Sequence, residues 1–168
     1  QIQVVWDSGS YDYYGRPVEG KLSNINMTIN ANEWSHIAVT FGEKTIKVYV
    51  NGVEKGSSTT NVPSSVNFGI AHNDEQGTRI TRCFWVGYSY EHARYFPGMM
   101  SELRIWNRVL TADELANATR RYGVDPKSEG LVTYWKCDEG QGDVIKDHTS
   151  YRNDLASDGL KWEPVSLP

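Results

Sequence analysis

The chain has 168 residues, of which 17 are Lys or Arg and 21 are Asp or Glu, so its formal net charge is −4. Because the basic residues are scattered and form no stripe, nothing in the sequence favours nucleic acid or an anionic membrane as a partner. No run reaches the roughly 20 apolar residues of a membrane span, and the length is typical of one domain, residues 1–168.

The first residues look like a strand that is entered midway. Residues 1–6 alternate weakly in hydropathy, and no signal-peptide pattern precedes them. We therefore expect a fragment or a processed chain that lacks its N-terminal strands. A stretch rich in Tyr and Gly follows over residues 11–20, without periodicity, and residues 21–29 alternate again.

The clearest strand pattern lies over residues 32–53. Its two alternating runs are separated by Gly42-Glu43, a turn short enough to make them antiparallel neighbours. Asn51-Gly52 is a strong hairpin signal because both residues tolerate a positive φ. This stretch predicts a three-stranded meander, in which the second run has one wholly apolar face: Ile46, Val48 and Val50.

The middle of the chain alternates between strand and turn signals. Residues 56–65 are polar and predict a surface loop, and residues 66–71 predict a strand. A polar turn is expected over residues 72–78, a strand over 82–88 and an aromatic-rich loop over 89–98.

The C-terminal part has the only convincing helix signal. Residues 99–107 alternate as a strand does, and Thr111 with Glu114 then forms the pattern of a capping box. We expect this short helix to end at Gly123 and a buried strand to cover residues 131–136. Two brief edge strands are expected at 144–145 and 160–162.

These elements predict an all-β fold. At least seven strands spaced by turns, with one short helix, favour a two-sheet antiparallel sandwich. Cys83 and Cys137 lie in apolar, strand-like runs, where they could pair in a secreted protein or remain two buried free thiols.

Several stretches together resemble a known family. N-E-W-S-H-I-A-V-T-F at 32–41, K-V-Y-V-N-G at 47–52 and F-P-G-M-M-S-E-L-R-I-W-N-R-V-L-T-A-D-E-L at 96–115 resemble, in order, the laminin-G-like domains of the concanavalin A-like lectin/glucanase superfamily. The stretch Y-W-K-C-D-E-G-Q-G-D-V-I-K-D at 134–147 looks like a further element of this family. The ending W-E-P-V-S-L-P is similar to that of such domains in surface proteins of gut Bacteroidetes.

The resemblance covers roughly residues 30–168 and implies a jelly-roll sandwich that binds glycans or other extracellular ligands. It also implies a secreted or cell-surface location, in the bacterial outer membrane or periplasm. The opening F-T-V-E-F-W-like strand of such domains is absent here, which agrees with a truncated N-terminus.

The acidic residues do not form a glucanase site. Retaining hydrolysis needs two carboxyl groups about 5–5.5 Å apart, which glucanases of this fold supply from an E-x-D-x-x-E strand. This triplet is absent, and the pairs Asp113-Glu114 and Asp138-Glu139 are adjacent, so on a strand their side chains point in opposite directions. We therefore expect no enzyme. The four His residues are isolated in the sequence and form no metal-binding spacing.

Two acidic, turn-rich segments, Asn73 to Glu75 and Asp138 to Asp147, could bind a hard cation. Calcium takes six to eight oxygen ligands from carboxylates, amides and carbonyls. The alternative is that these segments are merely solvated turns. The candidate calcium ligands are Asp74, Asp138, Asp147 and Asn153.

Aromatic side chains in the loops favour sugar recognition. Aromatic residues make up 12% of the chain, more than one core of this size requires, and many sit beside Gly, Ser and Asn. Pyranose C–H groups stack on aromatic rings while sugar hydroxyls bind polar side chains. The alternative is that these rings cap the ends of the sandwich, as we expect Trp34, Trp106 and Trp135 to pack in it. The candidate ligand-binding residues are Trp6, Tyr11, Asp12, Tyr13, Tyr14 and Arg16 in the first loop, and Tyr88, Tyr90, His92, Arg94 and Tyr95 in the second.

The sequence thus predicts a non-catalytic carbohydrate-binding module of a secreted or cell-surface bacterial protein, within a system that captures and utilises glycans. Its partners would be an oligo- or polysaccharide and other domains of a larger chain. The main alternative is an adhesion or spacer domain that contacts protein, and a glucanase-like hydrolase comes third.

Overall fold

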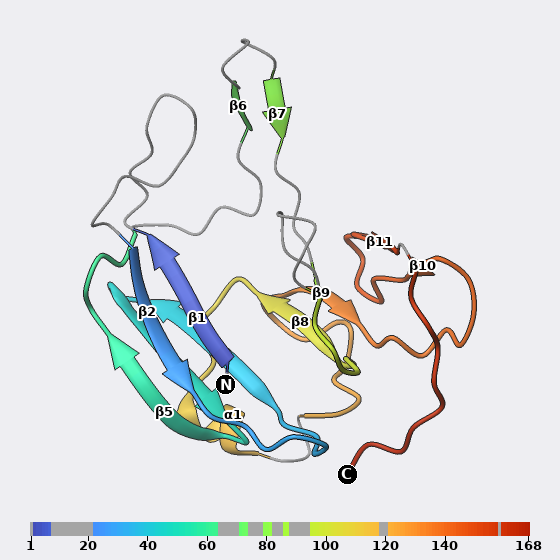
Figure 1. The fold of residues 1–168 in the computed structure, drawn as a ribbon, viewed down its shortest axis with the longest axis horizontal. Helices are drawn as coiled ribbons and strands as arrows, with labels where there is room; N and C mark the ends of the chain where they lie inside the picture. Colours follow the sequence, from blue (N-terminus) through green and yellow to red (C-terminus); the bar gives the residue numbers. More distant parts are fainter. Residues whose placement is uncertain are drawn as a thin grey trace. The chain divides into compact units, whose positions relative to one another are not determined.

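The computed structural model describes most of the chain as strands joined by turns (Figure 1). By their internal contacts its residues form two compact units: Gln1–Ile29, Val39–Val48 and Glu54–Pro97 make the first, and Asn30–Ala38, Tyr49–Val53 and Gly98–Pro168 the second. The described residues are 2–7, 22–63, 71–73, 79–81, 86–87, 95–117, 121–157 and 159–168.

The first two strands form a hairpin in register. β1 (Ile2–Asp7) pairs antiparallel with β2 (Leu22–Met27), so that Ile2 lies opposite Met27 and Gln3 opposite Asn26. The Gln3 amide donates to the Asn26 side-chain oxygen at 2.8 Å on the exposed face, while Met27 is buried on the other. The alternation predicted for both runs is confirmed.

The central meander is also confirmed, with one turn displaced. β3 (Ile37–Gly42), β4 (Thr45–Val50) and β5 (Val53–Ser58) form a sheet in that order. Asn51 and Gly52 both have positive φ, as predicted. The first turn lies at Glu43-Lys44, both at positive φ, and not at Gly42-Glu43, because two-residue hairpins of this geometry match the twist of the flanking strands.

Burial in the meander follows β4 more than β3. Ile46, Val48 and Val50 are buried, with Val48 fully so, and Tyr49 is buried as well. In β3 the buried residue is Thr40, whereas Val39 is 48% exposed, so the more apolar face of this strand is the outer one.

β5 extends into the stretch predicted as a loop. It runs to Ser58, and a Cβ on Gly56 would lie 2.8 Å from Cγ2 of Ile25. The missing side chain therefore lets the strand approach Ile25 closely, so the loop predicted over 56–65 begins only after Ser58.

A short antiparallel pair follows, formed by β6 (Ala71–Asn73) and β7 (Arg79–Thr81). Residues 72 and 73, predicted as part of a turn, belong to β6. Most of the strands predicted over 66–71 and 82–88 falls outside the described residues.

In the second unit, β8 (Leu103–Trp106) pairs antiparallel with β9 (Leu131–Trp135), with a bulge between Ile105 and Trp106. β8 is shorter than the predicted run of 99–107 because Glu102, at φ 60°, breaks the extended conformation just before it.

A partly buried polar cluster joins these two strands. The Glu102 carboxylate accepts hydrogen bonds from the Arg104 guanidinium and, at 2.7 Å, from the Tyr134 hydroxyl. The Arg104 guanidinium also lies 5.0 Å from the centroid of the Tyr134 ring, its cross-strand partner. Burial and the bond to Glu102 raise the pKa of Tyr134 to about 12, so this phenol remains a donor.

Helix α1 (Ala112–Ala116) begins as predicted and ends earlier. The Thr111 hydroxyl accepts from the Glu114 N–H at 3.2 Å and the Glu114 carboxylate accepts from the Thr111 N–H at 2.9 Å, which confirms the capping box. Arg108 also donates two bonds to that carboxylate. The predicted end at Gly123 is wrong, because Asn117 is already extended.

The last strands are β10 (Val144–Ile145) and β11 (Leu155–Ala156), an antiparallel pair. β10 was predicted and β11 was not. The strand predicted at 160–162 is wrong: the Trp162 indole N–H donates instead to the Gly142 carbonyl at 2.9 Å.

The fold class predicted from the sequence is confirmed as an all-β antiparallel sandwich of the jelly-roll type. The pairs β1–β2, β6–β7, β8–β9 and β10–β11 are all antiparallel, and the described residues contain one short helix. None of the described helices has the length and hydropathy that a membrane crossing requires.

The capping box gives a direct test of the helix start. Replacing Thr111 with Ala removes the acceptor of the Glu114 N–H and should lower the free energy of unfolding by about 1 kcal/mol in a denaturant titration. Thr111→Ser keeps the hydroxyl and serves as the matched control. Equal stability of the Ala variant and the parent chain would contradict this account of α1.

Candidate functional site

The segment after β9 is anchored by one buried carboxylate. Asp147 is 0% exposed, and its Oδ1 accepts from the Tyr134 N–H at 3.0 Å and from the Thr149 N–H at 2.9 Å. Its Oδ2 accepts from the Thr149 hydroxyl at 2.9 Å and from the Asn153 N–H at 3.0 Å. Asp147 also bridges to Trp135, so the segment runs antiparallel beside the end of β9.

The electrostatics of Asp147 follow from these donors. Burial alone would raise the pKa of the carboxyl, but the backbone N–H groups of Tyr134, Thr149 and Asn153 and the Thr149 hydroxyl outweigh it and hold the pKa below its ordinary value of 3.8. The group is therefore a carboxylate at neutral pH.

The chain turns sharply between β9 and this anchored segment. Cys137, at φ 61°, takes the left-handed conformation, and Asp138 and Glu139 follow it. The Glu139 Oε1 atom accepts from the Lys146 N–H at 2.8 Å, which ties the turn to the residue just before Asp147. The sequence could not show this closure, because it depends on the pairing beside β9.

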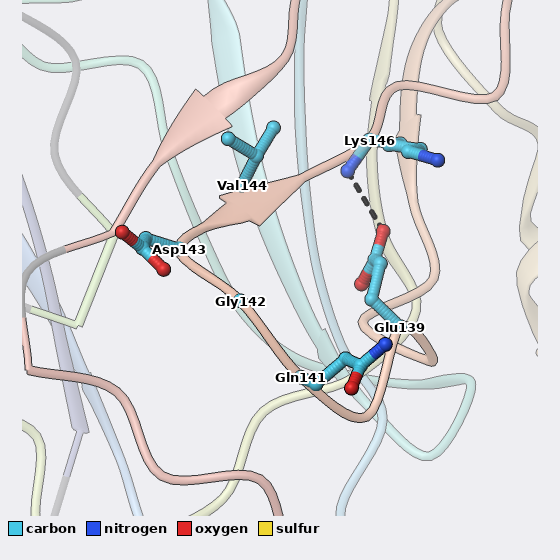
Figure 2. Close-up of a pocket in the computed structure, with 6 residues that line it drawn as sticks. All are labelled: Glu139, Gln141, Gly142, Asp143, Val144 and Lys146. Carbon is cyan, nitrogen blue, oxygen red and sulfur yellow. Dashed lines mark hydrogen bonds between the residues drawn. The ribbon is translucent and has the colours of Figure 1, made fainter.

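A shallow hollow lies on this turn (Figure 2). Its volume is about 460 Å³. Figure 2 shows Glu139 and Asp143 on opposite sides of the loop, with Gln141 at its turn and the bond from Lys146 to Glu139 dashed. The lining combines carboxylates, an amide and a lysine with one apolar side chain: Glu139, Gln141, Gly142, Asp143, Val144 and Lys146.

Three metal-ligating side chains meet beside this hollow. One donor atom from each of Asp138, Glu139 and His148 lies within 4.8 Å of the others. His148 Nε2 is 3.8 Å from Oδ1 of Asp138. The backbone N–H of His148 donates to the Tyr134 carbonyl at 2.9 Å. His148 is isolated in the sequence, and the fold brings it to Asp138 and Glu139 from the other side of a turn.

Cys137 is a free, half-buried thiol. Burial, reinforced by the charges of Glu139, Asp138 and Glu102, raises its pKa to about 12. The thiol therefore stays protonated and is a poor nucleophile. Cys83, with which it could pair in a secreted protein, lies outside the described residues.

Two of the predicted sugar-binding residues are described, both in the first unit. Tyr95 is 69% exposed. Trp6 is half-buried, and its indole N–H donates to the Thr60 carbonyl at 2.9 Å, which fixes the ring at the end of β1. The other predicted residues lie outside the described part of the chain: Tyr11, Asp12, Tyr13, Tyr14, Arg16, Tyr88, Tyr90, His92 and Arg94.

Three of the four predicted calcium ligands are described, and each has bonds or neighbours in the fold. Asp147 has both oxygens occupied by donors of the fold. The Asn153 side-chain amide donates to the Thr133 hydroxyl at 3.2 Å, and the Asn153 backbone carbonyl accepts from the Trp135 indole N–H at 2.8 Å. Asp138 belongs to the cluster with His148, and Asp74 lies outside the described residues.

Trp135, Trp106 and His36, which were also considered in the sequence, take part in packing or in hydrogen bonds of the fold. Trp135 is buried as expected, and the Arg108 guanidinium lies 5.3 Å from the centre of the half-buried Trp106 ring. His36 bonds through its backbone, donating to the Asn51 side-chain oxygen and accepting from the Asn51 N–H. Burial, and then Arg121 and Arg104, lower the pKa of the His36 imidazole.

The comparisons with known proteins decide the family. The laminin-G family model described as the concanavalin A-like lectin/glucanases superfamily matches residues 1–116. The chain belongs to this family. The match confirms the resemblance seen in the sequence and includes the opening residues that the resemblance did not cover. No curated protein matches the chain.

Solved structures are similar to this laminin-G-like chain over part of their own length. A crystal structure of a candidate carbohydrate-binding protein from Bacteroides ovatus ATCC 8483 shares 28% identity and a TM-score of 0.63, over 89% of this chain and 41% of that one. An S-layer domain-containing protein from Clostridium thermocellum ATCC 27405 shares 24% identity over 68% of this chain and 50% of its own. The TM-score of that second structure is 0.35.

The Asp147 anchor predicts a large, pH-dependent loss of stability. Asp147→Asn places an amide N–H₂ against buried donors and should lower the free energy of unfolding by about 3 kcal/mol at pH 7. Because the folded-state pKa is lowered, the contribution of the carboxylate is complete above about pH 4 and is lost as the pH falls through that pKa.

Urea titrations at pH 7 and at several lower pH values measure this difference between the parent chain and the variant. Asp113→Asn changes an exposed carboxylate of α1 and should alter stability by no more than about 0.5 kcal/mol. A gap between the parent chain and Asp147→Asn that is small at pH 7, or that grows on acidification, would contradict the proposed role of Asp147.

Proposed function

We propose that this laminin-G-like domain is a non-catalytic carbohydrate-binding module of a secreted or cell-surface bacterial protein that captures glycans. The observation that carries the proposal is the similarity to the candidate carbohydrate-binding protein of Bacteroides ovatus, which extends over 89% of the chain with a TM-score of 0.63. The chain spans 41% of that protein, so the role of the whole protein in glycan utilisation is part of the proposal.

The chemistry of the described residues supports sugar binding. Tyr95 presents a ring that is 69% exposed, as stacking on a pyranose face requires. Trp6 contributes a second, half-buried ring. Because its indole N–H is already bonded to Thr60, the exposed part of this ring can offer a ligand only its aromatic face. We place the glycan on the two aromatic loops that contain these residues, 6–16 and 88–95.

The hollow of Figure 2 is a further surface, lined mainly by polar residues, that could bind sugar hydroxyls. Asp143 can accept hydrogen bonds from hydroxyl groups, whereas Gln141 and Lys146 can donate to them. Pockets that bind sugars combine such planar polar groups with an apolar surface, which Val144 supplies here.

The absence of catalysis is part of the proposal, since the superfamily name covers both lectins and glucanases. Among the acidic pairs weighed in the sequence, Glu114 is bound by Arg108 and by the helix start. Glu139 is held by Lys146, next to Asp138 and His148. In the second pair the carboxyl groups converge, with an oxygen of Asp138 within 4.8 Å of one of Glu139, contrary to the opposite directions expected from the sequence. One Glu139 oxygen is bonded to Lys146 and the other is buried, so this pair does not present the two accessible carboxyl groups that glycoside hydrolysis requires.

One observation favours the alternative of a protein-binding adhesion or spacer domain. The run that follows the second aromatic loop is apolar and exposed, with Phe96 and Met99 both more than two-fifths accessible. Exposed Met and aromatic side chains are common at protein interfaces.

A glycan array followed by isothermal titration calorimetry tests the proposal. We expect binding of at least one oligosaccharide, and a loss of affinity of about fivefold on Tyr95→Ala, since an aromatic stacking contact contributes about 1 kcal/mol. Tyr13→Ala and Tyr90→Ala test the remainder of the two loops. Tyr151→Ala removes a similarly exposed ring, 61% accessible, from the C-terminal segment and is the matched control.

The outcomes separate the alternatives. Failure to bind any glycan, with retained binding to a protein partner, would favour the adhesion domain. Glycan binding that is weakened by Tyr151→Ala and unchanged in the three loop variants would show that the site is misplaced. Release of reducing sugar from the bound glycan would show an enzyme.

A further inference from the structure

We propose that Asp138, Glu139 and His148 bind one divalent transition-metal ion, of which Zn²⁺ is the probe that matches the donors best. The proposal is independent of sugar binding. It differs from the calcium site expected from the sequence, because it shares only Asp138 with that set and includes an imidazole.

The geometry brings three donors of the right type together. Their ligand atoms all lie within 4.8 Å of one another. Donor atoms around tetrahedral zinc are about 3.4 Å apart, given metal–ligand distances of about 2.0–2.2 Å. Binding would therefore bring the donor atoms closer by up to about 1.4 Å, and the Asp138 side chain, which is 63% exposed, is the one with room to make this approach.

Two of the donor atoms are buried without a hydrogen-bond partner among the described residues. They are Oε2 of Glu139 and Nε2 of His148. Buried polar atoms in native structures are nearly always paired, because an unpaired one destabilises the fold. A cation bound by the Glu139 carboxylate and the His148 imidazole would give both atoms a partner, and it would draw in the Asp138 carboxylate, which lies 3.8 Å from His148 Nε2.

The structure also holds these ligands in place. Oε1 of Glu139 accepts from the Lys146 backbone N–H at 2.8 Å. This bond orients the carboxylate and therefore also its other oxygen, Oε2. The backbone of His148 is fixed by its bond to the Tyr134 carbonyl and by the buried Asp147 before it. Supporting bonds of this kind orient metal ligands and raise affinity.

The donor set selects the class of ion. Calcium prefers six to eight oxygen ligands, whereas one imidazole with two carboxylates suits zinc and its first-row neighbours. Three protein ligands leave a fourth tetrahedral position open to water or to an incoming oxygen ligand. Glu139 also lines the hollow of Figure 2, so the open position would lie beside that surface.

Calorimetric titration of the metal-free domain with Zn²⁺, and separately with Ca²⁺, tests the site. We expect one Zn²⁺ per chain, no comparable Ca²⁺ binding, and a loss of Zn²⁺ affinity of at least about tenfold in His148→Gln and in Glu139→Gln. Glu163→Gln, an exposed carboxylate near the C-terminus, and His72→Gln are matched controls that should retain the affinity of the parent chain.

Two further measurements keep the test independent of folding and of glycan binding. Circular dichroism of each variant without metal must match that of the parent chain. The electron paramagnetic resonance spectrum of the Cu²⁺ complex should show coupling to a histidine nitrogen that disappears in His148→Gln.

Absence of one-to-one Zn²⁺ binding, or Zn²⁺ binding that both site variants leave unchanged, would overturn the proposal and leave His148 and Asp138 as an ion pair only. Because these titrations contain no sugar, their result does not depend on whether the domain binds glycans.

Discussion

The carboxylate of Asp147 is the constraint on which the C-terminal part of this domain depends. It collects the N–H groups of Tyr134, Thr149 and Asn153 and the Thr149 hydroxyl in a site without solvent. A neutral side chain could not accept all of these bonds, and each buried donor left unpaired would destabilise the fold. The loop from 147 to 153 is therefore held against β9 by one charge.

Several features follow from that attachment. With residues 147 and 148 held beside Trp135 and Tyr134, the turn at Cys137 returns Asp138 and Glu139 to the same place. The Lys146 N–H then bonds to Glu139, and the hollow of Figure 2 forms between this bond and the start of β10. A rigid β scaffold that presents polar loop residues in this way suits the binding of an external ligand.

The fold was largely predictable because its signals are local. Alternating side chains identified β1, β2, β4 and β9, and the spacing of Thr111 and Glu114 identified the start of α1. Errors arose where distant contacts decide. β5 extends past Gly56 because Ile25 packs on it, and β11 forms only because β10 is its partner.

The candidate site was predictable in composition and not in arrangement. The sequence indicated that the acidic turn around Asp138 could bind a cation, and that exposed rings such as Tyr95 could bind sugar. It could not show that His148 meets Asp138 and Glu139, because that meeting depends on a left-handed residue and on strand pairing across the turn. Nor could it show that the side chain of Asp147, the residue before His148, faces inward.

Amide hydrogen exchange at Tyr134, Thr149 and Asn153 tests this account most directly. If Asp147 holds the segment, these amides exchange as slowly as those of the paired residues in β9, and all of them accelerate together in Asp147→Asn. Exchange of Thr149 and Asn153 at the rate of exposed loop amides, while Tyr134 stays protected, would show that the carboxylate does not organise this part of the molecule.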